Sequence, residues 1–134
     1  MNTLTDCNLK TVEDMYAAFG RGDIDFIIDQ LSPDVRWTAH FDPIVPWAGD
    51  FSTKTKAPLF FKAISDNVEV LGFEPTENIS CGETVVSIGT FTCRANSTGK
   101  ATTTKWIFVW KFRDGKVQSY EQFHDGALVD IFRP

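Results

Sequence analysis

The sequence predicts an α+β fold in which helices come first and a curved sheet follows. Apolar residues recur at helical spacing in the first half of the chain and at the alternating spacing of strands in the second half. The strand-like segments are separated by short turn sequences, of which Asp114-Gly115 is the strongest hairpin signal. One of these segments is apolar on both faces, which favours a sheet wrapped around the helices.

Three helices are predicted in the first half, at residues 8–20, at residues 24–31 and from Pro58 onward. Asp23 supplies an N-cap for the second helix, and Ser32-Pro33 ends it. The apolar faces that predict the helices are Val12, Met15, Tyr16 and Phe19; Ile24, Ile27, Ile28 and Leu31; and Phe60, Phe61, Ile64, Val68 and Leu71.

The strands are expected to be one strand before the third helix and then an antiparallel meander. Their predicted ranges are 35–41, 73–81, 84–94, 100–113 and 116–123, with a loop over 42–54. On the 100–113 strand one face carries Trp106, Phe108, Trp110 and Phe112. The other face carries Ile107 and Val109, so both faces need cover. The alternation does not say which face is concave, and the concave side is expected to hold a pocket.

Composition narrows the class of protein. The chain has 134 residues, which predicts a single domain over 1–134. Its 13 Lys and Arg against 18 Asp and Glu give a net charge of −5, which disfavours nucleic acid and anionic membranes as partners. Three cysteines without ligand spacing predict no disulfide framework and no metal site. We expect no cofactor. The N-terminal residues resemble no signal peptide, so we expect a cytoplasmic protein.

Aromatic residues are unusually dense, with 12 Phe, 4 Trp and 2 Tyr. Such a set with few aliphatic residues is typical of a cavity for an apolar molecule, although a core can also use it. The residues predicted to bind this molecule are Tyr16, Trp37, Trp47, Phe51, Phe61, Trp106, Phe108 and Tyr120.

Several short motifs occur in an order that resembles the nuclear-transport-factor-2-like superfamily, and within it the SnoaL-like polyketide cyclases and ketosteroid isomerase relatives. These motifs are Met15 to Phe19 leading into Gly22-Asp23, Leu31 to Trp37, Trp47 to Phe51, Phe112 to Val117, and Glu121 to Asp125. The resemblance covers nearly the whole chain. It implies a cone-shaped, curved mixed or antiparallel sheet wrapped around three N-terminal helices, a cystatin-like α+β barrel.

The resemblance also implies candidate catalytic residues. In the isomerase relatives an Asp-Pro pair after the first strand supplies the general base, which points to Asp42; the alternative is that Asp42 only starts a turn. The oxyanion donors of that family fall near Met15 and Phe108, and neither side chain donates a strong hydrogen bond. Steroid isomerisation is therefore disfavoured. Epoxide hydrolysis is disfavoured too, because its second Asp position is occupied by Asn96.

Three more residues could move a proton. In the cyclase branch an Asp at the end of the last strand is the acid–base catalyst, which points to Asp125; it could instead cap a short helix over 126–132. His124 beside it faces the other way if the strand is regular. His40 on the first strand is a proton shuttle or an ordinary surface or core residue.

Two functional hypotheses and one expectation about assembly follow. The chain is a cofactor-independent isomerase or cyclase acting on an apolar carbonyl-bearing molecule, or a non-catalytic binding or dimerisation module of the same fold. A homodimer through the outer sheet face would cover Ile107 and Val109, and the alternative cover is the C-terminal segment 126–134.

Overall fold

The computed structural model describes residues 3–134, which form four helices and six strands. No helix in this range is both long and apolar enough to cross a bilayer. In chain order the elements are α1 (Thr3–Gly20), α2 (Ile24–Asp29), β1 (Leu31–His40), β2 (Gly49–Asp50), α3 (Ala57–Asn67), β3 (Val68–Cys81), β4 (Thr84–Ala95), β5 (Ala101–Arg113), β6 (Lys116–His124) and α4 (Ala127–Phe132).

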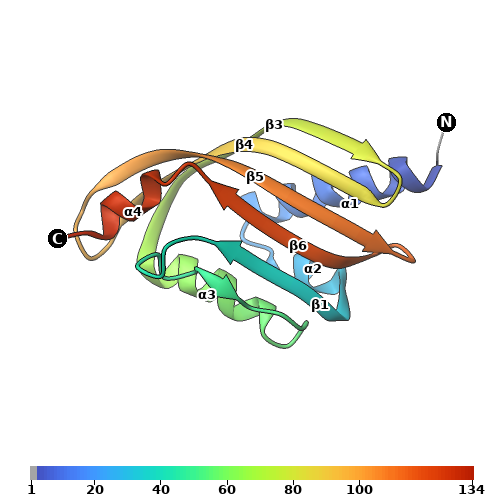
Figure 1. The fold of residues 1–134 in the computed structure, drawn as a ribbon, viewed down its shortest axis with the longest axis horizontal. Coiled ribbons are helices and arrows are strands. Elements are labelled where there is room, and N and C mark those ends of the chain that lie inside the picture. The colour runs from blue at the N-terminus through green and yellow to red at the C-terminus, as the bar shows by residue number, and fades with distance from the viewer. Residues whose placement is uncertain (1–2) are drawn as a thin grey trace.

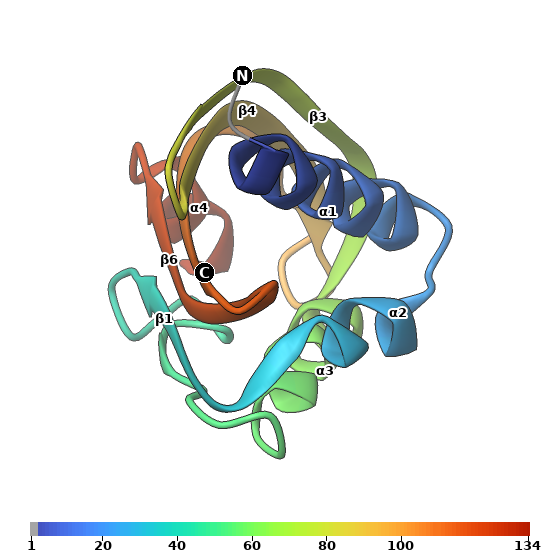
Figure 2. The same cartoon turned by 90° about the vertical axis from the view of Figure 1, so that its right-hand side faces the viewer.

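All six strands belong to one curved sheet with the order β2-β1-β6-β5-β4-β3 (Figure 1). β1 runs parallel to β6, and the other neighbours are antiparallel. Figure 2 shows β3, β4, β6 and β1 following one arc, with α1, α2 and α3 across its open side. The predicted α+β fold, a curved sheet wrapped around three helices, is confirmed, and the sheet does not close on itself.

The structure resolves which face of β5 is concave. Trp106, Phe108 and Trp110 are buried, whereas Ile107 between them is 42% exposed. The aromatic face of β5 therefore looks inward and belongs to the core, and the aliphatic face is convex. This alternation follows from the pleat, which sends successive side chains to opposite faces.

The C-terminal helix α4 packs on the concave side of the sheet. Leu128 and Ile131 are buried in the core, and the Phe132 ring lies 5.8 Å from the ring of Trp47. The Thr98 hydroxyl, in the turn between β4 and β5, donates to the Ile131 carbonyl and holds the helix in place. The C-terminal segment is thus not the cover of the convex face, where Ile107 stays exposed.

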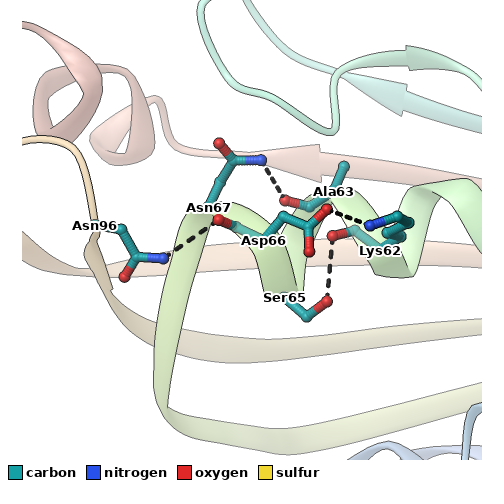
Figure 3. Close-up of polar contacts among 6 residues, drawn as sticks. All are labelled: Lys62, Ala63, Ser65, Asp66, Asn67 and Asn96. Carbon is teal, nitrogen blue, oxygen red and sulfur yellow. Dashed lines mark hydrogen bonds and ion pairs between the residues drawn. The ribbon is translucent and has the colours of Figure 1, made fainter.

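The predicted third helix is shorter than its apolar pattern suggests (Figure 3). α3 ends at Asn67, so Val68 and Leu71 lie in β3 and Leu71 is exposed. The Asn67 side chain donates to the Ala63 carbonyl at 2.7 Å. The side chain of Asn96 donates to the Asp66 carbonyl at 3.3 Å, and its backbone N–H donates to the Asn67 carbonyl at 2.9 Å. The two bonds from Asn96 satisfy carbonyl groups that a longer helix would have paired. Because Asn96 comes from the distant β4–β5 turn, local periodicity does not reveal this end.

The first strand starts earlier than predicted, at Leu31 and not at Val35. Leu31, which fits the apolar face of the preceding helix, pairs with Val117 on β6, and the pairing is irregular between Leu31 and Arg36. Pro33 is exposed in this irregular part of the strand. Proline has no backbone N–H to donate to a neighbouring strand, so it fits where the pairing is interrupted. The first helix also begins earlier than predicted, at Thr3.

Candidate functional site

A cavity of about 50 Å³ lies inside the curve of the sheet. Its walls come from α1, α2, α3, the loop between β1 and β2, and strands β1, β3, β4, β5 and β6. Seven of the eight residues predicted to bind a ligand line it, namely Tyr16, Trp37, Trp47, Phe61, Trp106, Phe108 and Tyr120. Phe51 does not line the cavity; its ring packs 5.7 Å from that of Phe60, which does.

The cavity walls are held by ring-on-ring packing. Trp106 stacks on Phe108 with centroids 3.8 Å apart, and Trp37 lies 4.1 Å from Tyr120. Tyr16 approaches both Trp106 and Trp110 at about 6 Å. Offset and edge-on aromatic pairs contribute beyond their buried area, which makes these walls firm.

Gly89 on β4 leaves the space that the Trp106 indole occupies. A Cβ added at Gly89 would lie 2.5 Å from the Glu74 carbonyl oxygen and 2.7 Å from Cη2 of Trp106. The indole therefore lies directly over the glycine backbone. A glycine inside an otherwise β-branched strand is a sequence signal for such a close approach, and our sequence analysis overlooked it.

Four side chains separate the cavity from an open groove of about 860 Å³ on the surface. Phe19, Phe61, Ile64 and Phe73 line both spaces. The rings of Phe19 and Phe73 meet edge to face at 5.0 Å, and both side chains are half-buried. This pair thus forms a half-buried part of the wall between the two spaces.

Within the described residues 3–134, four buried polar atoms of the cavity walls have no hydrogen-bond partner in the protein. They are Trp37 Nε1, Trp106 Nε1, Gln122 Oε1 and His124 Nε2. A buried polar group without a hydrogen-bond partner lowers the stability of the folded state by about 1–3 kcal/mol. Four such groups around one cavity indicate that a ligand supplies their partners. Two are N–H donors, and Gln122 Oε1 is an acceptor.

The two tyrosine hydroxyls of the cavity are already bonded. Trp110 Nε1 donates to the Tyr16 hydroxyl at 2.8 Å, and Gln122 Nε2 donates to the Tyr120 hydroxyl. Burial raises the pKa of both Tyr16 and Tyr120 well above the usual phenol value. Both rings therefore stay neutral and help to define the cavity walls.

Among the described residues that line the cavity, the titratable side chains are those of Tyr16, Tyr120 and His124. Tyr120, Gln122 and His124 are two residues apart on β6 and share its concave face. Burial lowers the pKa of His124 to about 3, and the nearby Asp125 carboxylate opposes this only in part. The imidazole is thus neutral at neutral pH. Gln122 is the polar residue of the cavity that the sequence analysis missed, although its alternation with Tyr120 along the strand could have indicated it.

The other predicted catalytic residues lie outside the cavity. Asp42 is exposed, and its carboxylate accepts from the Ile44 N–H at 2.9 Å in a turn. His40 lies on the convex face, stacked on Phe123 and 2.9 Å from the Glu121 carboxylate. Asp125 is exposed at the end of β6 and accepts from the Ala127 N–H at the start of α4. Of the four candidates, only His124 lines the cavity.

The described part of the chain, residues 3–134, contains no cluster of three or more His, Cys, Asp or Glu side chains arranged to hold a metal ion. The residues that line the cavity include no Lys, Arg, Asp or Glu within the same range. The chemistry available in the cavity is therefore that of aromatic faces, indole N–H groups, one amide and one neutral imidazole.

Comparison with known proteins places this arrangement in a family. The SnoaL-like domain family matches residues 12–120. Among curated proteins no match is found. Of the solved structures, an NTF2-like protein of unknown function from Burkholderia pseudomallei is 30% identical, with a TM-score of 0.85 over 96% of this chain and 98% of that chain. An NTF2-like protein from Burkholderia xenovorans is 29% identical, with a TM-score of 0.86 and the same coverage.

A third structure, TerC co-crystallised with polyporic acid, is 24% identical, with a TM-score of 0.79 over 94% of this chain and 98% of that chain. At this identity the likeness concerns the fold alone. The match to the family extends over most of the chain. The chain is therefore a member of the SnoaL-like domain family, within the NTF2-like fold.

Proposed function

We propose that this protein binds a small, uncharged, largely apolar molecule that carries a carbonyl group, and that the molecule occupies the aromatic cavity. The observation that carries the proposal is the set of unpartnered polar atoms within aromatic walls, above all the indole N–H groups of Trp37 and Trp106. A carbonyl oxygen would accept from such a donor, and apolar rings would replace water against the walls. A carboxylate would find no Lys or Arg among the lining residues described.

Access is through the surface groove. The cavity of about 50 Å³ is smaller than a ring-bearing ligand needs, so its walls must move. Phe19 and Phe73 border both cavity and groove, and their rings touch only at edge-to-face distance. Rotation of these two half-buried rings would join the two spaces.

Acid–base turnover is the second candidate function. The observation that favours it is the buried, unpartnered Nε2 of His124 in the same cavity. A neutral imidazole can take a proton from the carbon next to a carbonyl, the first step of an isomerisation or a cyclisation. Its pKa of about 3 makes it a weak base at neutral pH, so binding is the primary proposal.

One experiment separates binding from turnover. Acetophenone titrated into the protein in H₂O is expected to shift the indole N–H resonances of Trp37 and Trp106, whereas benzoate at the same concentration leaves them unchanged. In a parallel sample in D₂O, exchange of the methyl protons of acetophenone for deuterium reports proton abstraction. If His124 is the base, His124→Phe lowers the exchange rate at least about a hundredfold.

Each outcome has a defined meaning. Shifts without exchange above the buffer rate leave a binding protein and remove the enzyme hypothesis. Equal shifts with benzoate contradict a cavity selective for uncharged molecules. Mass spectrometry of the denatured protein after purification would in addition identify any molecule that it retains.

We also propose that two copies pair through the convex face of the sheet. Ile88, Ile107 and Phe123 lie in register across β4, β5 and β6, and Phe123 is 39% exposed. Such an apolar row is typical of a protein interface. Sedimentation at micromolar concentration is expected to show a dimer for the wild type and a monomer for Ile107→Glu. Leu59→Glu, on α3, is the control and should remain dimeric, because Leu59 is exposed away from this row. A wild-type monomer would contradict the proposal.

A further inference from the structure

Thr104 on β5 connects His124 in the cavity with Asp125 at the surface. Its hydroxyl oxygen lies 2.7 Å from Oδ1 of Asp125 and 3.4 Å from Nδ1 of His124. Asp125 is itself fixed by the Lys105 N–H at 3.1 Å and the Ala127 N–H at 3.0 Å. The three side chains thus form a chain that runs from the exposed end of β6 to the cavity wall.

The direction of the hydrogen bonds in this chain follows from counting protons. A carboxylate only accepts, and a threonine hydroxyl has one proton to give. The short contact assigns that proton to Asp125, whose pKa the Thr104 hydrogen bond holds below its usual value. Toward His124 the hydroxyl oxygen can then only accept, so Nδ1 of the neutral imidazole carries the hydrogen.

The tautomer of His124 determines whether its Nε2 donates a hydrogen bond to a ligand or accepts one. With the hydrogen on Nδ1, the buried Nε2 of His124 presents a lone pair. Gln122 Oε1, the other unpartnered acceptor of the cavity, lies two residues away on the same face of β6. This side of the cavity therefore presents two acceptors without a partner, whereas the indoles of Trp37 and Trp106 supply donors without a partner elsewhere on its walls.

We infer that the ligand is a neutral phenol or enol whose O–H group donates to Nε2 of His124, and that Thr104 and Asp125 are positioning residues that hold the imidazole in the accepting tautomer. This inference rests on the proposed function, because it takes the cavity to be a binding site. It narrows the ligand from a carbonyl-bearing apolar molecule to one that carries a hydroxyl donor as well.

The tautomer can be measured without any ligand. Long-range ¹⁵N–¹H correlation spectra distinguish a protonated ring nitrogen from an unprotonated one, and the chain has only two histidines, so His40→Gln assigns both. We expect the Nδ1–H form for His124 at neutral pH. Thr104→Val removes the acceptor and is expected to produce a mixture of tautomers. Thr103→Val, the neighbour on the opposite face, is the matched control and should leave the spectrum of His124 unchanged.

Phenol and toluene, which have nearly the same shape, test the consequence for binding. The ratio of phenol to toluene affinity, read from the Trp indole resonances, is expected to fall about twofold or more in Thr104→Val, because only part of the protein then holds the accepting tautomer, and to stay constant in Thr103→Val. The Nε2–H form in the wild type, or the same ratio in both variants, overturns the inference. If toluene still binds in that case, the proposed function survives. If neither probe binds, the proposed function fails, and the wild-type tautomer still tests the hydrogen-bond chain.

Discussion

Replacing Gly89 with alanine is expected to lower the free energy of unfolding by about 3 kcal/mol or more. The new methyl group would lie 2.5 Å from the Glu74 carbonyl oxygen and against the six-membered ring of the Trp106 indole. Neither neighbour yields easily, because one is backbone in β3 and the other is a fully buried ring. Overpacking on this scale forces a shift of backbone or rotamer.

Thermal and urea unfolding measure this effect. For a domain of this size the loss corresponds to a fall of roughly 10 °C in Tm. Gly72→Ala is the matched control, since a Cβ at Gly72 would lie 3.7 Å from Cβ of Thr92, an ordinary contact. That variant is expected to stay within about 1 kcal/mol of the wild type. Equal stability of the two alanine variants would contradict the close packing of Trp106 on β4.

Gly89→Ala should also affect the cavity. Trp106 stacks on Phe108 at 3.8 Å and on Phe73 at 5.2 Å, so displacing the indole disturbs two more walls. Phe73 belongs to the pair of rings that separates the cavity from the groove. A single glycine in β4 thus couples the stability of the sheet to the shape of the proposed binding site.

Much of the fold could be read from the sequence, because local chemistry encodes it. The period change, the Asp114-Gly115 hairpin and the aromatic alternation from Trp106 to Phe112 all depend on neighbours along the chain. The predicted bounds of helices and strands are wrong where a residue distant in the sequence determines the end of an element. α3 ends at Asn67, where the Asn96 side chain donates to the Asp66 carbonyl. Leu31 belongs to β1 because it pairs with Val117 on β6.

The candidate site was harder to predict for a related reason. Which face of β5 is concave depends on the whole sheet, so the residues were identifiable but their direction was not. Asp42 fits the family position of a base, and its carboxylate accepts from the Ile44 N–H in an exposed turn. His124 lines the cavity, whereas its neighbour Asp125 lies outside it. Asp125 is connected to His124 by hydrogen bonds through the Thr104 hydroxyl. A side chain on the adjacent strand makes this link, and sequence spacing does not encode it.

His124 is expected to make the protein sensitive to mild acid. Burial lowers its pKa to about 3 in the folded state, against 6.5 for an ordinary histidine. The groups that face its ring are Thr104 and Asp125 on one edge, with Phe41 and Phe108 nearby. Between these two pKa values the unfolded chain binds a proton that the folded chain does not. The free energy of unfolding therefore falls as the pH drops from 6.5 toward 3.

Each pH unit within this interval removes up to about 1.4 kcal/mol from the free energy of unfolding. Urea unfolding followed by tryptophan fluorescence at pH 7 and pH 4.5 is expected to show the loss in the wild type. His124→Phe should be nearly flat over the same interval, because a phenylalanine takes up no proton. His40→Gln is the matched control, because it removes the other histidine, which lies exposed on the convex face, so a loss that persists in this variant belongs to His124.

The pH interval separates this effect from that of the carboxylates. The pKa of Asp125 is lowered by its bond to Thr104, and that of Asp50 by its bonds to Ser52. The stability that these carboxylates confer is present above the ordinary value of 3.8 and is lost as the pH falls through their lower folded values. A slope between pH 6.5 and 4.5 therefore reports on His124, and a slope below pH 3.8 includes the carboxylates. A wild-type protein equally stable at pH 6.5 and 4.5 would show that His124 accepts its proton in the folded state, and that its imidazole is not shielded from water.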